Sequence, residues 1–342
     1  MIMLTNLVQG SKHGKLITFI AIVFLSGCSS PIKTDNKIRY SLDQSWPQLP
    51  ANYVLGNPTG IGIDSHQNII VFHRAERTWP TIGAMPATLI PSKTIIVLDK
   101  ETGTIINSWG DNLFIMPHGL TVDKDDNIWV TDVGLHQVFK FDHNGKLLMK
   151  LGEEKIAGND TLHFNMPTGI AVARDGSFYV SDGYGNSRIM KFSADGKYIS
   201  QWGSKGNKKG QFNIPHAVCL DNKGNVYVAD RENKRVEVFD SGGKFRTQWT
   251  NKNFGRICSI TYDSVSKYFF AVDDKTSFLN LAHRGSDVII FDTAGNTITN
   301  FGRSGAYDGP RCWYHDIAVD NEQNIYVGDI LGNRIQKFRK LK

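Results

Sequence analysis

Apolar and polar residues alternate along most of this chain in short runs that recur at a regular spacing. In one copy, an alternating run at 119–123 is followed by a polar turn and by an aromatic-rich run at 127–132 that ends in an aspartate. Similar pairs of runs begin at positions 58, 117, 167, 215, 257 and 314. Short alternating runs bounded by turn residues predict β-strands. After residue 27 no stretch shows helical periodicity of useful length.

Each repeat also carries a second pair of apolar runs. In the second copy these runs are Val138–Phe141 and Leu147–Lys150, and the tight-turn dipeptide Asn144-Gly145 lies between them. Four short strands per repeat at this period are typical of a β-propeller blade. The six repeats therefore predict an all-β protein, a six-bladed β-propeller that spans residues 41–342.

Composition and charge narrow the choice of partners. The chain has 342 residues and a formal net charge of +6, which is spread along the sequence rather than gathered in a basic block with interleaved aromatic residues. Nucleic-acid binding is therefore not expected. We expect a monomer that acts on a small molecule or a peptide.

The first 27 residues have the pattern of a targeting segment. Lys12 and Lys15 precede the apolar run Leu16–Leu25, which at about ten residues is too short to span a bilayer as a helix. The run ends in Leu25-Ser26-Gly27-Cys28, which resembles a bacterial lipoprotein cleavage box. We therefore expect residues 1–27 to be a signal peptide. An ordinary secretory signal that ends near a cysteine is the alternative.

If the lipoprotein interpretation is right, Cys28 becomes the lipidated first residue, with palmitate among its acyl chains. Residues 28–40 then form a flexible tether, and the protein is exported and anchored to a bacterial membrane on its periplasmic or cell-surface side. Cys219, Cys258 and Cys312 remain, an odd number with no recognisable disulfide spacing. We interpret them as small apolar residues, with one pair left open.

Three histidines occupy one position of the repeat, directly after its first residue. The six residues at this position are Thr59, His118, Thr168, His216, Cys258 and His315. The histidines fall in the second, fourth and sixth repeats, so in a ring they would stand about 120° apart. Three neutral imidazoles that converge in this way can bind Zn²⁺ and leave a fourth position open, as in catalytic zinc sites. Otherwise each histidine only caps a strand beside a buried carbonyl group.

A second set of polar residues follows the second run of the repeat. Arg74 and Arg231 both stand sixteen residues after the start of their repeats, the first and the fourth, and Tyr184 stands seventeen residues after the start of the third. These positions place two cations and a phenol on the same face of the ring as the histidines. Surface ion pairs are the alternative role for the two arginines.

Several segments together resemble a known family. They are 71–74 (Val-Phe-His-Arg), 113–120 (Leu-Phe-Ile-Met-Pro-His-Gly-Leu), 129–140, 181–189 and 228–235 (Val-Ala-Asp-Arg-Glu-Asn-Lys-Arg). The repeats resemble NHL repeats. Over residues 50–340 they are similar to peptidyl-α-hydroxyglycine α-amidating lyase, the second catalytic domain of peptidylglycine α-amidating monooxygenase.

The resemblance implies two metal ions. The three ring histidines would bind a catalytic Zn²⁺. A structural Ca²⁺ would bind to the backbone carbonyl groups of Ile61 and Leu120 and to the carboxylate of Asp316, since oxygen ligands suit this hard cation.

The implied reaction cleaves a carbinolamide, R-CO-NH-CH(OH)-COO⁻, into R-CO-NH₂ and glyoxylate. Tyr184 would be the general base, and zinc with a neighbouring guanidinium would favour its phenolate form. We expect Arg74 to be that neighbour and Arg231 to grip the carboxylate or a carbonyl group of the substrate, although the two roles can be exchanged.

This chain departs from the family pattern at two places. Trp313-Tyr314 stands where the family usually has Met-Pro before its third histidine, so Trp313 is expected to reshape or narrow the substrate pocket. Gly185 stands where the family has a disulfide cysteine. Both departures put the substrate in question more than the chemistry.

Other functions remain open. The natural substrate is a peptidyl-α-hydroxyglycine, another N-acyl-α-hydroxyglycine, or ureidoglycolate, which carries the same NH-CH(OH)-COO⁻ group. A different class is a non-catalytic cell-surface propeller that binds protein or glycan around a structural zinc. A third is a metal-dependent hydrolase such as a lactonase, although those sites favour carboxylates and asparagine around calcium.

Overall fold

Six four-stranded antiparallel sheets make up the regular structure of the part of the chain that the computed structural model describes, residues 38–80, 84–275, 285–302 and 312–342. The expected signal peptide, Cys28 and most of the tether lie outside these residues. Every regular element in the described ranges is a strand, and none of them contains a helix long and apolar enough to cross a bilayer. Residues 37–342 form one unit.

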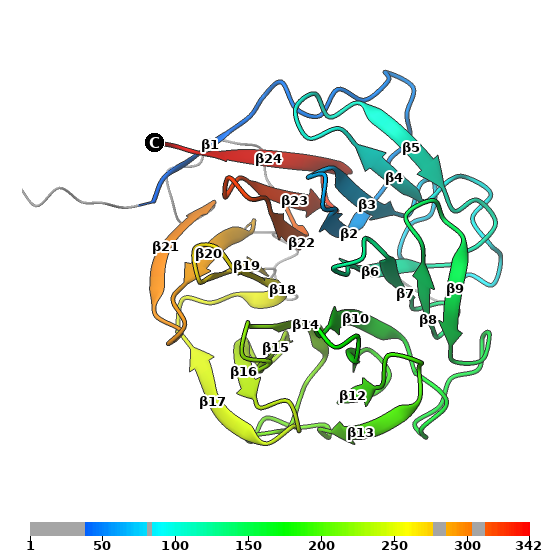
Figure 1. Cartoon of the computed structure of the whole chain (residues 1–342), viewed down its shortest axis with the longest axis vertical. Coiled ribbons are helices and arrows are strands. Elements are labelled where there is room, and N and C mark those ends of the chain that lie inside the picture. The colour runs from blue at the N-terminus through cyan, green and yellow to red at the C-terminus, as the bar shows by residue number, and fades with distance from the viewer. Residues whose placement is uncertain (1–37, 81–83, 276–284, 303–311) are drawn as a thin grey trace, which may run out of the picture. The chain divides into compact units, whose positions relative to one another are not determined.

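The first three blades follow one another along the chain, and each has its strands in sequence order from the axis outward (Figure 1). Blade 1 contains β2 (Pro58–Ile63), β3 (Ile69–His73), β4 (Ile95–Leu98) and β5 (Ile105–Trp109). Blade 2 contains β6 (Pro117–Val122), β7 (Ile128–Asp132), β8 (Gln137–Phe141) and β9 (Leu147–Leu151). Blade 3 contains β10 (Pro167–Val172), β11 (Phe178–Asp182), β12 (Arg188–Phe192) and β13 (Tyr198–Trp202).

The next three blades complete the ring, which confirms the predicted six-bladed propeller. Blade 4 contains β14 (Pro215–Leu220), β15 (Val226–Asp230), β16 (Arg235–Phe239) and β17 (Phe245–Thr250). Blade 5 contains β18 (Arg256–Asp263), β19 (Tyr268–Asp274), β20 (Asp287–Phe291) and β21 (Thr297–Gly302). Blade 6 contains β22 (Tyr314–Val319), β23 (Ile325–Asp329), β24 (Arg334–Lys340) and β1 (Tyr40–Leu42).

The last blade takes its outermost strand from the other end of the chain. β1 pairs antiparallel with β24, with Tyr40 opposite Lys340 and Leu42 opposite Phe338. Asp43 extends this join, because its backbone N–H donates to Lys337 O at 2.8 Å and its carboxylate accepts from Arg339 Nε at 2.7 Å. The ring is therefore closed by strand pairing within one sheet.

The hydrophobic core lies between the blades. Six buried clusters each join the facing sides of two consecutive sheets, for example Phe72 and Phe114 with Phe139 between blades 1 and 2. Because each sheet is covered on both faces, second strands such as β7 and β11 are buried at every residue, and each opens with three apolar or aromatic residues. In each of the outer strands β9 and β13, three residues are exposed and two are half-buried.

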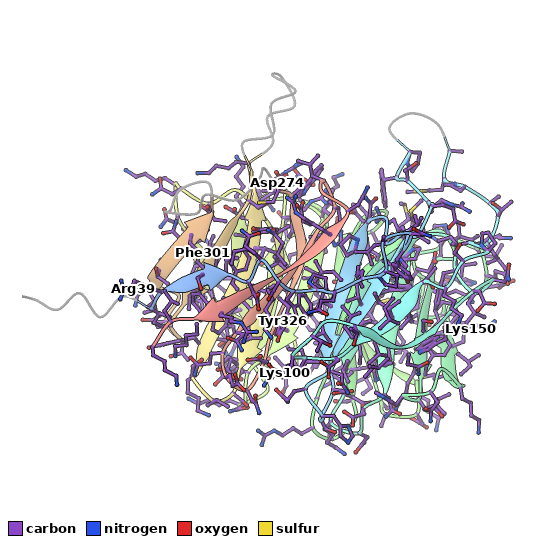
Figure 2. All side chains as sticks on the ribbon, turned by 90° about the horizontal axis from the view of Figure 1, so that it is seen from above. Arg39, Lys100, Lys150, Asp274, Phe301 and Tyr326 are labelled. Carbon is purple, nitrogen blue, oxygen red and sulfur yellow. The ribbon has the colours of Figure 1, made fainter. Side chains whose placement is uncertain are left out.

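The ring has two faces that carry different loops. The side view places Asp274, at the end of β19, near one face and Lys100, in the β4–β5 turn, near the opposite face (Figure 2). Since the second strand of every blade ends on the Asp274 face, the loops that carry Arg74, Tyr184 and Arg231 all lie there. Cys219, Cys258 and Cys312 are buried free thiols, so their apolar role is confirmed and no disulfide forms among them.

Candidate metal centre and active site

Each innermost strand begins with an irregularity at the same place. The pairing register with the second strand shifts across residue 59 in blade 1 and at the equivalent point of every other blade. Such β-bulges are common beside functional sites because they redirect a side chain. Here the shifted residues are the six ring-position residues of the sequence repeat, and all six line the central channel.

The three ring histidines converge as predicted. One ring nitrogen from each of His118, His216 and His315 lies within 4.8 Å of the other two, and all three side chains are buried. The ring centroids form a nearly equilateral triangle with sides of 4.7, 4.7 and 4.9 Å. This is a group that can hold one metal ion.

A backbone carbonyl group from the following blade fixes each imidazole. His118 Nδ1 lies 2.7 Å from Thr168 O, His216 Nδ1 lies 2.6 Å from Cys258 O, and His315 Nδ1 lies 2.8 Å from Thr59 O. A carbonyl oxygen can only accept, so each Nδ1 carries the proton and each Nε2 presents a lone pair. The ring positions that lack a histidine thus supply the second layer that orients metal-binding imidazoles.

The charges around the triad oppose protonation of the imidazoles. Burial lowers the pKa of His315 to about 3, with the positive charge of Arg74 adding to the effect. Burial also brings the pKa of His118 and of His216 well below the usual range, helped by nearby His315 and Arg231 respectively. All three rings are therefore neutral at physiological pH, the state that a metal ion requires.

The phenol of Tyr184 stands directly against this cluster. Its oxygen lies 3.2 Å from His118 Nε2 and 3.1 Å from His216 Nε2, and Arg231 Nη1 donates to it at 3.2 Å. A single phenolic proton can serve only one of the two Nε2 lone pairs. A cation bound by the three Nε2 atoms would satisfy all of them, so the donor set fits a metal ion. Three imidazoles suit Zn²⁺ among other transition metals.

Arg74 is linked to the phenol of Tyr184 through Trp79. Arg74 Nε donates to Pro117 O at 3.1 Å, and its guanidinium lies 5.0 Å from the centre of the Trp79 ring. The Trp79 and Tyr184 rings pack with centroids 5.2 Å apart. Burial lowers the pKa of Arg74 to about 10, which still leaves the side chain charged at neutral pH. Of the two arginines, Arg231 is the one that donates to the phenol, which is the alternative that the sequence had left open.

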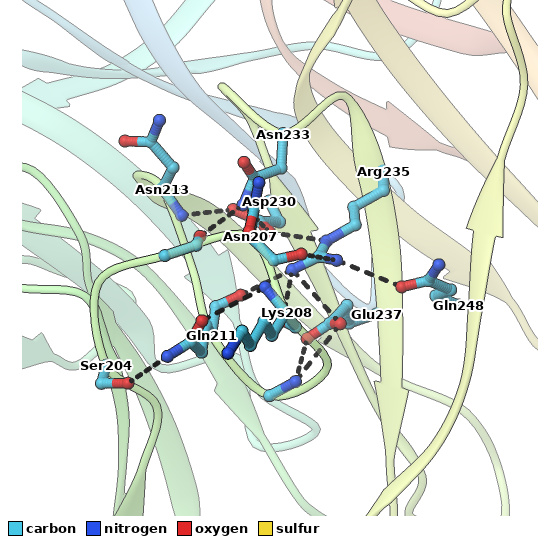
Figure 3. Close-up of polar contacts among 12 residues, drawn as sticks. Ser204, Asn207, Lys208, Gln211, Asn213, Asp230, Asn233, Arg235, Glu237 and Gln248 are labelled. Carbon is cyan, nitrogen blue, oxygen red and sulfur yellow. Dashed lines mark hydrogen bonds and ion pairs between the residues drawn. The ribbon is translucent and has the colours of Figure 1, made fainter.

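Buried aspartates at the ends of second strands position the segments that lead into the histidines. Asp230 Oδ1 accepts from Asn213 N at 2.7 Å, and its other oxygen accepts from Arg235 Nε at 2.8 Å. Arg235 also donates to backbone carbonyl groups at Asn207, Lys208 and Gln211, which holds the loop before His216 (Figure 3). Asp132 and Asp329 likewise accept from the backbone just before the other two histidines. The aspartate that ends each of these second strands therefore fixes the backbone just before each ring histidine.

The expected calcium ligands line the same channel, a cavity of about 350 Å³ on the axis. Asp316 accepts from Ile61 N at 2.7 Å and from Ser259 Oγ at 2.5 Å. Burial raises the pKa of the Asp316 carboxyl to about 7. Leu120 lies beside blade 1, since a Cβ atom on Gly60 would come within 2.5 Å of it. The structure therefore brings the three residues to one channel.

Trp313 stands two residues before His315 in the chain. The backbone N–H of Trp313 donates to Asp329 Oδ1 at 2.8 Å, and the Arg256 guanidinium lies 5.7 Å from the centre of the Trp313 ring. The repeat pattern did not single out Trp79, Arg256 or Glu232, because each stands in a segment that differs from blade to blade. The residues whose carbonyl groups accept from the three imidazoles could have been identified from the sequence, since they occupy the ring position of blades 1, 3 and 5.

Comparison with known proteins agrees with this architecture. The family model described as NHL repeat matches residues 114–141, 164–192 and 212–239. The chain is 35% identical over 320 residues to peptidyl-glycine alpha-amidating monooxygenase B of Xenopus laevis, which covers 88% of this chain and 35% of that protein. It therefore spans only about a third of the length of such monooxygenases.

Two relatives match along most of their length. Identity is 34% over 319 residues with peptidyl-alpha-hydroxyglycine alpha-amidating lyase 2 of Drosophila melanogaster, covering 87% of this chain and 75% of that protein. It is 30% over 347 residues with NHL repeat-containing protein 3 of Homo sapiens, covering 94% and 93%. A solved streptogramin B lyase structure has a TM-score of 0.56 at 16% identity, over 89% of this chain and 88% of that one, and shows the fold alone.

Fold and site together define an NHL-repeat propeller with a three-histidine centre on its axis. The match to the Drosophila lyase adds the family, and the chain belongs to the peptidyl-α-hydroxyglycine α-amidating lyases.

Proposed function

We propose that the protein is a carbon–nitrogen lyase that cleaves an N-acyl-α-hydroxyglycine into the corresponding amide and glyoxylate. The observation that carries the proposal is the Tyr184 oxygen, held within 3.2 Å of two imidazole Nε2 atoms and of Arg231. A surface that only binds protein or glycan does not need an ionisable oxygen against a three-nitrogen metal site. Membership of the lyase family supports the same reaction.

The reaction requires the substrate hydroxyl group to lose a proton and the amide nitrogen to gain one. Tyr184, as general base, takes the proton of the substrate hydroxyl group, and the electron pair on that oxygen forms the carbonyl group of glyoxylate. The carbon–nitrogen bond breaks, and the amide nitrogen takes up a proton to give R-CO-NH₂. Zn²⁺, when bound by the three histidines, supplies Lewis acidity toward the substrate oxygen.

The two arginines divide the remaining work. Arg231 donates to the Tyr184 oxygen and so stabilises its anionic form. Arg74 is assigned to the substrate carboxylate, an ion that a guanidinium binds well. Its Nε donates to Pro117 O and its Nη1 donates to Asn57 Oδ1 at 3.4 Å, which hold the guanidinium in place. This assignment exchanges the roles that the sequence suggested.

Glyoxylate release tests the proposal. The protein is loaded with zinc or treated with a chelator and incubated with α-hydroxyhippurate, and then with ureidoglycolate. Zinc-dependent release from the first substrate supports the lyase function, and a preference for the second would move the natural substrate toward ureidoglycolate. Tyr184→Phe should keep its zinc and lose most of its turnover. Full activity in that variant would refute the role of the base.

A Ca²⁺ ion beneath the triad is a second part of the proposal. Asp316 is a buried carboxylate, and within the described ranges no Lys or Arg side chain forms an ion pair with it. Metal analysis of the purified protein should find calcium as well as zinc. Asp316→Asn should lose the calcium, whereas equal calcium in the variant would contradict this site.

We also propose export and lipid anchoring through Cys28, on the basis of the apolar run Leu16–Leu25 and the Leu25–Cys28 box. Palmitate labelling in a bacterial host should mark the wild type and not Cys28→Ala. Labelling of both would exclude this anchor.

A further inference from the structure

We propose that Glu232 is a positioning residue that holds Arg231 in the orientation from which it contacts Tyr184. Arg231 Nε donates to Glu232 Oε1 at 3.0 Å, while Nη1 of the same guanidinium donates to the Tyr184 oxygen at 3.2 Å. A guanidinium is planar, so fixing its Nε edge fixes the direction of Nη1. The catalytic consequence rests on the proposed lyase function, whereas the positioning itself does not.

Glu232 is itself held from two directions. Its backbone N–H donates to Asn213 O at 3.0 Å, which ties it to the segment before His216. Arg256 Nη1 donates to the same Oε1 atom at 3.5 Å, and Arg256 Nε donates to Asp274 Oδ2 at 3.1 Å. One carboxylate therefore stands between two guanidinium groups from neighbouring blades.

Because Arg231, Glu232 and Arg256 are largely buried, the charge of the Glu232 carboxylate has a strong effect on the position of Arg231. The side chains of Arg231 and Arg256 are only 14% and 9% exposed, and that of Glu232 is 26% exposed. Two guanidinium groups that approach one oxygen repel each other, and the repulsion is strong where water is scarce. The negative charge of the Glu232 carboxylate offsets this repulsion by attracting both groups. Without the charge on Glu232, Arg231 is expected to move away from Arg256 and to lose its fixed contact with the phenol.

The contrasting possibility is an ordinary surface ion pair, which contributes little and leaves the reaction untouched. The two possibilities differ in what Glu232→Gln does. A positioning residue that acts through Arg231 should change kcat, because Arg231 serves the tyrosine base. KM should change little, because Arg74 binds the substrate carboxylate.

The first measurement is steady-state kinetics of zinc-loaded Glu232→Gln with α-hydroxyhippurate. We expect kcat to fall about tenfold or more, the effect of losing a charge-assisted hydrogen bond, with KM within about twofold of the wild type. Glu232→Asp keeps the charge and should recover part of the loss. Glu322→Gln is the matched control, because Glu322 pairs with Lys100 at 2.7 Å on the opposite face, and it should behave as the wild type.

The second measurement needs no turnover. In ¹⁵N NMR spectra, the Arg231 Nε–H signal, assigned by its disappearance in Arg231→Lys, should exchange slowly with water in the wild type and rapidly in Glu232→Gln. An unchanged kcat together with slow exchange in Glu232→Gln would overturn the proposal. If the wild type releases no glyoxylate from any hydroxyglycine, the lyase function fails, and the exchange rate alone then decides whether Glu232 holds Arg231.

Discussion

Gly119 leaves room for the carbonyl group that orients His118, the first of the three ring histidines. A Cβ atom at this position would lie 2.5 Å from Thr168 O and 3.0 Å from Gly169 Cα. Thr168 O is the atom that accepts from His118 Nδ1 at 2.7 Å. Replacing Gly119 with alanine should therefore disturb the metal site without touching a ligand.

The size of the disturbance follows from the distances. Ordinary contacts begin at 3.4 Å, so a Cβ atom at 2.5 Å requires the carbonyl oxygen to withdraw by the difference, 0.9 Å, or the inner strand to shift by as much. Either movement breaks the hydrogen bond to His118 Nδ1. Loss of such an outer partner typically costs about 10- to 100-fold in metal affinity. The overpacking should also reduce the free energy of unfolding by about 1–3 kcal/mol.

The assay is competition for zinc between the protein and a chelator of known affinity, with circular dichroism to confirm the fold. Gly169→Ala is the control, because its Cβ atom would meet nothing nearer than Ser181 Oγ at 3.1 Å. Gly119→Ala should bind zinc at least about tenfold more weakly than Gly169→Ala. Equal zinc affinity in two well-folded variants would refute the role assigned to the Thr168 carbonyl group.

Three further predictions concern neighbouring groups. His315 has a pKa of about 3 when folded and 6.5 when unfolded, so it contributes stability above pH 6.5 that is lost on acidification. Between pH 7 and 5, the metal-free wild type should therefore lose about 2 kcal/mol more in urea unfolding than His315→Gln, and equal losses would contradict this burial. Trp79→Ala should lower kcat while Trp79→Phe largely preserves it; equal rates would show that the ring packing does not matter. Asp230→Asn should lose about 2 kcal/mol in the same unfolding assay because the buried charge-assisted hydrogen bond from Arg235 Nε is weakened, while Glu237 still pairs with Arg235 at 3.3 Å. The exposed Asp195→Asn should not lose stability, and equal stability of the two variants would argue against the buried pair.

The repeat pattern was sufficient to predict the blades. Five of the six repeat starts coincide with the first residue of an innermost strand, and the fifth strand begins one residue earlier, at Arg256. The prediction succeeds because each blade must bury the same faces against its neighbours, which imposes one pattern six times. The ring position could be predicted for the same reason, since a bulge at one point of the repeat turns every such side chain toward the axis.

Contacts made across blades could not be predicted from the repeat. Whether Arg74 or Arg231 reaches Tyr184 depends on how each loop leaves its second strand, and the two loops differ in sequence. Trp79 and Glu232 have no equivalents in the other blades, so no periodic signal marks them. The hydrogen bonds to Nδ1 depend on the direction of a carbonyl group in the next blade, which residue identity does not determine.

The pairing of β1 with β24 has a consequence for the order in which the metal centre is assembled. His315 belongs to the blade that stays incomplete until Lys340 meets Tyr40. During synthesis, His118 and His216 can reach their places on the partial ring while the third histidine still lacks the outer strand of its blade. Tight zinc binding is therefore expected only once the two ends of the ring have met, which makes occupancy of the site a marker that distinguishes completed chains from truncated ones.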